Sequence, residues 1–235
     1  MIKRPRYIWG WVVIAALIGG VYATWEHYYP SGSWRYKMTV VVQTPEGIKT
    51  GSAVREVDAS CGPQLLSTAP CNTYLAKGEA VVVNLGKRGV LFALMEGEDG
   101  SVDYGYNIVF KAYPFQAPPS TIGAYIKHYR SLKSGKVVLP TALYPMFVYF
   151  KNLKDPNSIK STYYLPSTFG KGVKLKEVTI AMTDEPVTHK IKKWLPWLGP
   201  PKPVKFNPKN VPMPGEPQFY KNLLLSPYNF YRGGW

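Results

Sequence analysis

Polar and apolar side chains alternate along several short stretches of the chain, which is the period of a half-buried β-strand. In the first of these, apolar side chains occupy every second position from Tyr36 to Val42, and a turn signal at residues 44–47 follows. A glycine-flanked turn at residues 86–89 similarly separates two apolar runs. The predicted strands cover residues 35–43, 50–57, 79–85, 90–95, 102–113, 137–139, 146–150 and 173–182. The pattern therefore predicts a mainly β domain, β-sandwich-like or α+β.

Two stretches follow the period of an amphipathic helix instead. Ser120 can cap the first, and Gly135 suits its end. Its apolar stripe is Ile122, Tyr125, Ile126, Tyr129 and Leu132, and its other side shows Lys127, His128, Arg130 and Lys133. The second is expected after residues 183–186, where a capping residue, two acids and a proline suit a first helical turn. Its apolar stripe would be Val187, Ile191, Trp194 and Leu195.

The longest apolar run covers residues 7–25 and carries no charge. As a helix it would extend roughly 28 Å, close to the ~30 Å hydrocarbon core of a bilayer. Lys3, Arg4 and Arg6 precede it and Glu26 follows it. The sequence therefore predicts a single transmembrane anchor in an inner membrane, with the N-terminus in the cytoplasm and the domain in the periplasm.

A cleaved secretory signal is the alternative interpretation of the same run. Residues 8–18 would be its apolar part, and residues 21–23 form an acceptable cleavage site, so that residues 1–23 would be removed. Aromatic residues at both ends of the run, among them Trp9, Trp11 and Trp25, favour retention because such rings anchor a helix at the two membrane interfaces. Both interpretations place the domain outside the cytoplasm.

The two cysteines agree with that location. Cys61 and Cys71 lie in a loop-like stretch, and in an oxidising compartment such a pair is most simply a disulfide. Closing so short a loop is worth roughly 3 kcal/mol. A metal role is disfavoured, because the chain has no second cysteine pair and no histidine near these two.

Composition divides the remaining chain. We expect a basic tip at residues 1–6, the anchor or signal at 7–25, a domain at 34–198, and a proline-rich strap with an aromatic tail at 199–235. The formal net charge is +15, and most of the surplus lies in the second half. Outside the cytoplasm the nearest polyanions are lipid head groups and envelope polymers, so a nucleic-acid partner is not expected.

Known catalytic motifs are absent from the sequence. It has no His-Glu-x-x-His, no Gly-x-Ser-x-Gly and no Ser-x-x-Lys, and residues 47–52 lack the upstream glycine of a phosphate loop. Asp184 and Glu185 are explained as helix-capping acids rather than as a catalytic pair. We therefore predict no catalytic residue, no metal ligand and no cofactor.

One surface is a candidate for binding. Cationic and indole side chains of the second predicted helix suit an anionic membrane surface. They are Lys190, Lys192, Lys193, Trp194 and Trp197. The alternative is that Trp194 anchors this helix in the core while the lysines are merely solvated.

Short segments spread over residues 34–198, and one near the C-terminus, resemble a group of uncharacterised proteins from Gram-negative bacteria that also begin with an apolar segment. The segments are residues 34–40, 44–47, 50–52, 144–146, 155–156, 169–173, 183–188, 195–198 and 232–234. The resemblance implies no activity and no functional residue.

Together these observations favour a membrane-anchored, non-enzymatic binding or assembly component of the envelope. Its expected partners are the membrane lipid surface and other envelope proteins or anionic polymers. The alternative is an envelope hydrolase acting on an anionic polymer or lipid, which would require two acidic side chains converging in a pocket with shifted pKa values.

Overall fold

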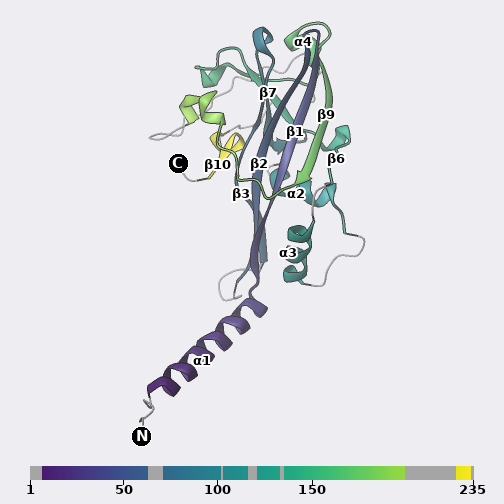
Figure 1. Ribbon diagram of the computed structural model, residues 1–235. Coiled ribbons are helices and arrows are strands. Elements are labelled where there is room, and N and C mark those ends of the chain that lie inside the picture. Colours follow the sequence, from purple (N-terminus) through teal and green to yellow (C-terminus); the bar gives the residue numbers. More distant parts are fainter. Residues whose placement is uncertain are drawn as a thin grey trace.

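Two antiparallel β-sheets form the domain of the computed structural model, which describes residues 7–62, 71–101, 103–115, 121–132, 135–198 and 226–233 (Figure 1). The large sheet has the order β10-β3-β2-β1-β9-β6 and the small sheet the order β4-β5-β7-β8. The strands are β1 (Ser31–Thr44), β2 (Gly47–Cys61), β3 (Cys71–Glu79), β4 (Val81–Asn84), β5 (Val90–Gly97), β6 (Val137–Val138), β7 (Pro145–Phe150), β8 (Ile159–Ser161), β9 (Lys174–Met182) and β10 (Tyr231–Arg232). The helices are α1 (Tyr7–Tyr28), α2 (Tyr104–Ala112), α3 (Ile122–Ser131) and α4 (Leu165–Phe169). The mainly β prediction is confirmed.

The first hairpin forms the spine of the molecule. β1 and β2 pair without interruption from Ser31↔Ser60 to Thr44↔Gly47, as the alternating pattern predicted. The inward side chains of β1 are buried, from Trp34 to Val42. Where β2 crosses β4, a Cβ on Gly51 would lie 2.1 Å from the carbonyl oxygen of Val82, so only glycine permits this approach.

The small sheet is covered on both faces, since every residue of β5 is buried. One face packs against the large sheet. Short 3₁₀ turns, η4 (Ile191–Lys193), η5 (Pro196–Leu198) and η7 (Pro227–Asn229), lie with β10 against the other. That second core contains Phe92, Leu94, Phe150, Ile191, Leu195, Leu198, Phe230 and Tyr231. The described part of the aromatic tail is thus docked on the domain, whereas residues 199–225 of the strap and tail lie outside the described residues.

The strand predicted over residues 102–113 is wrong, because residues 104–112 form α2. Tyr104 and Ile108 lie one helical turn apart on the buried face, together with Gly105 and Val109. This run suits both periods, and the packing of its face on β3 and β5 decides for the helix.

The helix predicted after residues 183–186 is also wrong, because the segment from 184 to 188 is hydrogen-bonded to the large sheet. The Thr188 amide donates to the Val54 carbonyl at 3.2 Å, and the Thr188 hydroxyl accepts from the Val54 amide at 3.1 Å. Arg35 binds the carbonyls of Asp184 and Glu185, which a helix would need for its own first turns. Between residues 187 and 198 the chain forms the single turns η4 and η5 instead.

The first predicted helix is confirmed as α3, with different ends. Its N-cap is Thr121, whose hydroxyl accepts from the Ala124 amide at 3.3 Å, and Leu132 is its C-cap. Ser120 lies outside the described residues. The helix ends at Ser131, four residues before Gly135.

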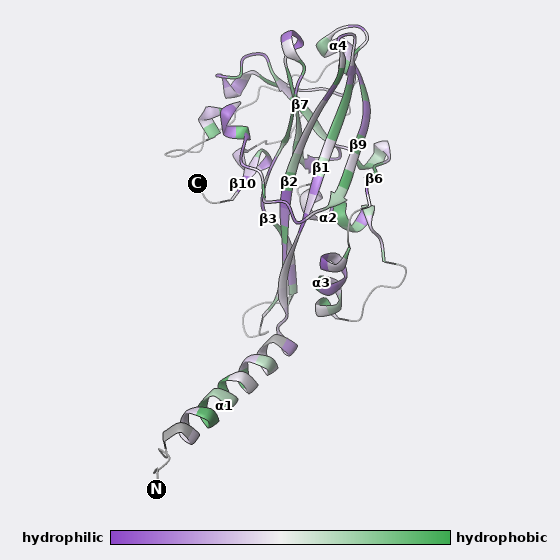
Figure 2. Ribbon diagram, viewed as in Figure 1, coloured by the Kyte–Doolittle hydropathy of each residue, from purple (hydrophilic) through white to green (hydrophobic). Residues whose placement is uncertain are grey.

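α1 leaves the domain at the base of β1 and extends into open space (Figures 1 and 2). All residues from 9 to 25 are exposed, including Trp9, Trp11, Leu17 and Val21. No helix in the described part of the chain is both long and apolar enough to cross a membrane, so the predicted transmembrane helix is not confirmed.

The predicted disulfide is confirmed and ties the base of the hairpin. Cys61 and Cys71 are bonded and paired between β2 and β3. The Cys61 amide also donates to the carbonyl of Pro30 at 3.0 Å. The disulfide therefore braces the strands next to the junction with α1.

Candidate functional site

A pocket of about 560 Å³ opens at the α1 end of the domain. Three segments line it: the start of β1, the end of α3 and the loop after β9. Its residues are Ser33, Trp34, Arg35, Tyr129, Arg130, Leu132, Met182, Thr183 and Asp184. A second hollow of about 440 Å³ shares Arg130 and reaches Pro30 and Ser31, which join α1 to β1. We call the first of these the anchor-proximal pocket.

The pocket exists because α3 packs directly on the base of the hairpin. A Cβ on Gly32 would lie 2.6 Å from the Ile126 side chain, so glycine here allows the close approach. The Trp34 and Tyr129 rings stack with centroids 5.1 Å apart, and Phe110 of α2 packs against both. These aromatic contacts fix the position of Arg130, which follows Tyr129 in α3.

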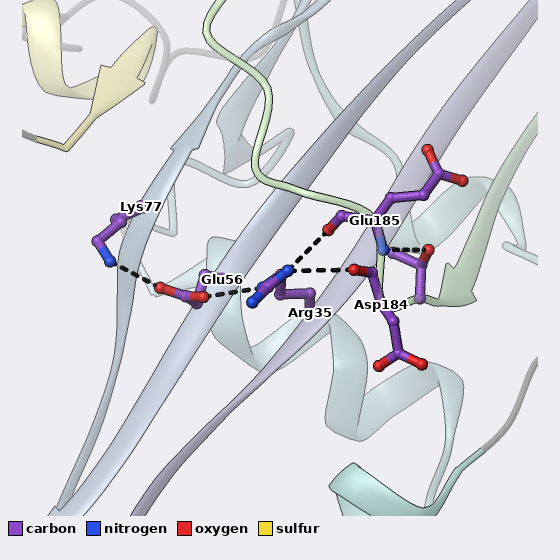
Figure 3. Close-up of polar contacts among 6 residues, drawn as sticks. Arg35, Glu56, Lys77, Asp184 and Glu185 are labelled. Atoms are coloured by element: carbon purple, nitrogen blue, oxygen red, sulfur yellow. Dashed lines mark hydrogen bonds and ion pairs between the residues drawn. The ribbon is translucent and has the colours of Figure 1, made fainter.

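Arg35 connects β2 with the loop after β9 (Figure 3). Its Nε donates to Glu56 at 2.9 Å, while its Nη1 donates to the carbonyls of Asp184 and Glu185 at 3.2 and 3.1 Å. Its Nη2 has no bond to any described residue. Arg35 therefore fixes the loop after β9 and still offers an unused donor edge to the pocket.

Glu56 balances two cations, because it also accepts from Lys77 at 3.0 Å. Burial alone would raise the pKa of Glu56, but the bonds from Lys77 and Arg35 outweigh it and lower this pKa. Glu56 is therefore ionised at neutral pH, and the Lys77–Glu56–Arg35 group keeps one net positive charge beside the pocket.

Two charged groups of opposite sign line the pocket without partners in the described part of the chain. Arg130 is exposed and makes no ion pair or hydrogen bond through its guanidinium there. The carboxylate of Asp184 is likewise unpaired, and Figure 3 shows it pointing away from Arg35. The pocket therefore presents both a free cation and a free anion to a ligand.

The pocket wall also contains an unsatisfied donor. Trp34 is 4% exposed, and its indole Nε1 is buried with no hydrogen-bond partner. A buried donor without an acceptor costs about 1–3 kcal/mol.

The five residues predicted to bind a membrane surface lie elsewhere, on the flank of the domain and away from α1 (Figure 1). Trp194 and Trp197 are half-buried against the second core, and the Trp197 indole donates to the Leu153 carbonyl at 2.8 Å. Lys192 lies 4.8 Å above the Tyr231 ring, while Lys190 and Lys193 are exposed. The structure does not bring these five residues to the pocket, and their binding to a membrane surface stays a prediction.

The hydrolase alternative requires paired carboxylates in a pocket. Glu96 and Asp99 are the nearest approach, because burial raises the pKa of Glu96 to about 7 while a hydrogen bond from Ser101 lowers the pKa of Asp99. Neither residue lines the anchor-proximal pocket or the hollow beside it; Glu96 is covered by Asn229, which donates to it. Nor does the described part of the chain contain a cluster of three or more potential metal ligands.

Comparison with known proteins adds no relative: no family model, no curated protein and no solved structure matches this chain. The predicted resemblance to Gram-negative proteins therefore stays a prediction. Sequence reasoning found the basic side of α3 but missed the pocket, whose lining comes from residues 33–35, 129–132 and 182–184. No local spacing joins segments so far apart.

Proposed function

We propose that this protein is held at a membrane by α1 and acts outside the cytoplasm as a non-enzymatic binding or assembly component. The observation that carries the proposal is the exposure of α1. Its apolar side chains point in every direction around the helix, and residues 9–25 all lack cover from the domain. A helix that is apolar on all sides is stable only where an apolar environment surrounds it.

We favour lipid as the apolar environment that surrounds α1. Indole rings flank the aliphatic middle of α1, with Trp9 and Trp11 towards its N-terminal end and Trp25 towards its C-terminal end. Indoles prefer the boundary between lipid and water, so this arrangement suits a membrane at both ends of the aliphatic part.

The disulfide supports the proposed location of the domain outside the cytoplasm. Bonds such as Cys61–Cys71 persist in oxidising surroundings, including the bacterial periplasm. Lys3, Arg4 and Arg6 precede α1, and basic residues are retained on the cytoplasmic side. An inner-membrane protein with its domain in the periplasm accounts for both observations.

The test is extraction of the full chain from membranes with alkaline carbonate. Wild-type protein should stay in the pellet, and the double variant Ile14→Lys/Ile18→Lys should be released, because each lysine in the middle of an inserted helix costs about 2.5–3.5 kcal/mol. The matched control places two lysines at exposed apolar positions of the domain, Ile48→Lys/Val138→Lys, and should stay in the pellet.

Release of the wild-type protein by carbonate would overturn the proposed anchoring. Intact mass of the pelleted protein gives a second check. A mature N-terminus at Thr24 would show that residues 1–23 are a cleaved signal, and α1 would then not be an anchor.

A further inference from the structure

The anchor-proximal pocket combines features that select one kind of ligand. Three groups lining it have no partner among the described residues: the Nη2 edge of Arg35, the guanidinium of Arg130 and the carboxylate of Asp184. A purely anionic ligand would be repelled by Asp184, and a purely cationic ligand by the two arginines. A group with both charges a few ångströms apart satisfies all three.

We propose that this pocket binds the phosphate–ammonium head group of an ethanolamine phospholipid. Arg130 and Arg35 contact the phosphate, because guanidinium groups present parallel N–H donors that match phosphate oxygens. Asp184 accepts from the primary ammonium. Ser33 adds a hydroxyl at the same wall.

The aromatic wall distinguishes ethanolamine from choline. A quaternary ammonium group has no N–H to donate and is recognised by exposed faces of aromatic rings. Here the two rings stack on each other and are hidden: Trp34 is 4% exposed and Tyr129 is 1% exposed. The pocket therefore offers a carboxylate for a donating ammonium rather than an aromatic cage.

The position of the pocket favours a lipid as the source of this head group. Pro30 and Ser31 follow α1 directly and line the neighbouring hollow together with Lys127 and Arg130. If α1 lies in lipid, this end of the domain is at head-group level. The source of the ligand thus rests on the proposed membrane location, whereas the chemistry of the pocket does not.

Binding can be measured on the full chain in micelles of a sugar-headed detergent, where no phosphate competes and anchoring is not at issue. The probes are short-chain phosphatidylethanolamine, phosphatidylglycerol and phosphatidylcholine, with soluble glycerophosphoethanolamine as the free head group. The readout is the indole N–H resonance of Trp34, identified by its loss in Trp34→Phe. It should shift on binding, because Trp34 is part of the pocket wall.

We expect the ethanolamine lipid to bind more tightly than the other two lipids. Arg130→Gln should weaken binding of both ethanolamine and glycerol lipids by roughly tenfold or more, the value of a hydrogen bond to a charged group. Asp184→Asn should weaken only the ethanolamine lipid by about tenfold, and thus remove the preference. Both positions are exposed or at the pocket rim, so thermal unfolding should be unchanged.

The matched controls are Glu185→Gln and Lys190→Gln, which remove the same charges outside the pocket and should change the affinities less than about twofold. The head-group assignment would be overturned if Asp184→Asn lowered the affinities for the ethanolamine and glycerol lipids equally, or if Arg130→Gln left lipid binding unchanged. Free glycerophosphoethanolamine binding as tightly as the lipid would overturn the membrane source. Carbonate extraction answers the separate question of anchoring.

Discussion

Two apolar, tryptophan-rich regions of this protein differ in their exposure to solvent. α1 carries Trp9, Trp11 and Trp25 into open space, while the segment with Trp194 and Trp197 lies half-buried on the small sheet beside the docked residues 226–233. The sequence predicts a transmembrane anchor or a cleaved signal for the first region and a membrane-binding surface for the second. The difference lies in what each region faces, because the small sheet has a second apolar face that needs cover and α1 has no such neighbour.

The sequence of β5 carries the information that distinguishes them. Residues 90–95 are apolar without alternation, which indicates a strand buried on both faces. A strand of this kind requires a second layer besides the large sheet. The later aromatic segments provide it, with Trp194 and Trp197 half-buried against this second core.

The largest effect should come from removing the centre of that second layer. Phe230 is fully buried and packs against Phe92 and Phe150. Phe230→Ala should lower the free energy of unfolding by about 3–5 kcal/mol, because it leaves a cavity between the sheet and its cover. Urea denaturation measures the loss. Tyr228→Ala, in the same segment but 60% exposed, should change it by less than about 0.5 kcal/mol.

Opening the disulfide should have the next largest effect. Cys61→Ser/Cys71→Ser should lower the free energy of unfolding by about 3 kcal/mol, because the unfolded chain gains the freedom of an open loop. Reduction of wild-type protein should give the same loss in urea denaturation. If free thiols are found by mass mapping in protein taken from its native compartment, the predicted bond does not form there.

Docking of residues 226–233 should depend on pH through Glu96. Burial raises the pKa of Glu96 to about 7, so the folded protein holds this proton more tightly than the unfolded chain. The contribution to stability is complete below the unfolded value near 4.5 and is lost as pH rises through 7. Wild-type protein should therefore lose about 2 kcal/mol between pH 5 and pH 8 through this group.

Glu96→Gln should abolish that part of the pH dependence while keeping an acceptor for Asn229. Denaturation of both proteins at pH 5 and pH 8 measures the difference. Glu185→Gln is the control, because its carboxylate is exposed and lies away from this cover. A difference between pH 5 and pH 8 that survives in Glu96→Gln would assign the effect to other groups.

The smallest effect is expected from the exposed side of the covering segment. Lys190→Gln/Lys192→Gln/Lys193→Gln should shift the free energy of unfolding by less than about 1 kcal/mol, the order of a cation–π contact such as that of Lys192 with the Tyr231 ring. The same variant of the full chain should remain bound to anionic vesicles with less than about a twofold change if α1 is the anchor. Clear release of this variant from the vesicles in a sedimentation assay would show that these lysines bind the membrane surface.

Local patterns predicted the elements whose contacts are local. The β1–β2 hairpin follows from alternation and one turn, and α3 from its apolar stripe. The sequence predicts a strand where α2 lies, because a short apolar run fits both periods. The helix predicted after residue 183 does not form, because Arg35 and Val54 bind this segment to the large sheet. Both residues are far away from it in the sequence. The anchor-proximal pocket was not predictable for the same reason, since three distant segments form it.

The position of Phe230 in the chain has a consequence for synthesis. Phe92 and the rest of β5 leave the ribosome long before residue 230, and β10 pairs with β3 across a similarly long separation. During that interval one face of the small sheet is exposed, and exposed apolar strands are prone to aggregate. The small sheet of the nascent domain therefore lacks its complete cover until residues 226–233 have been made.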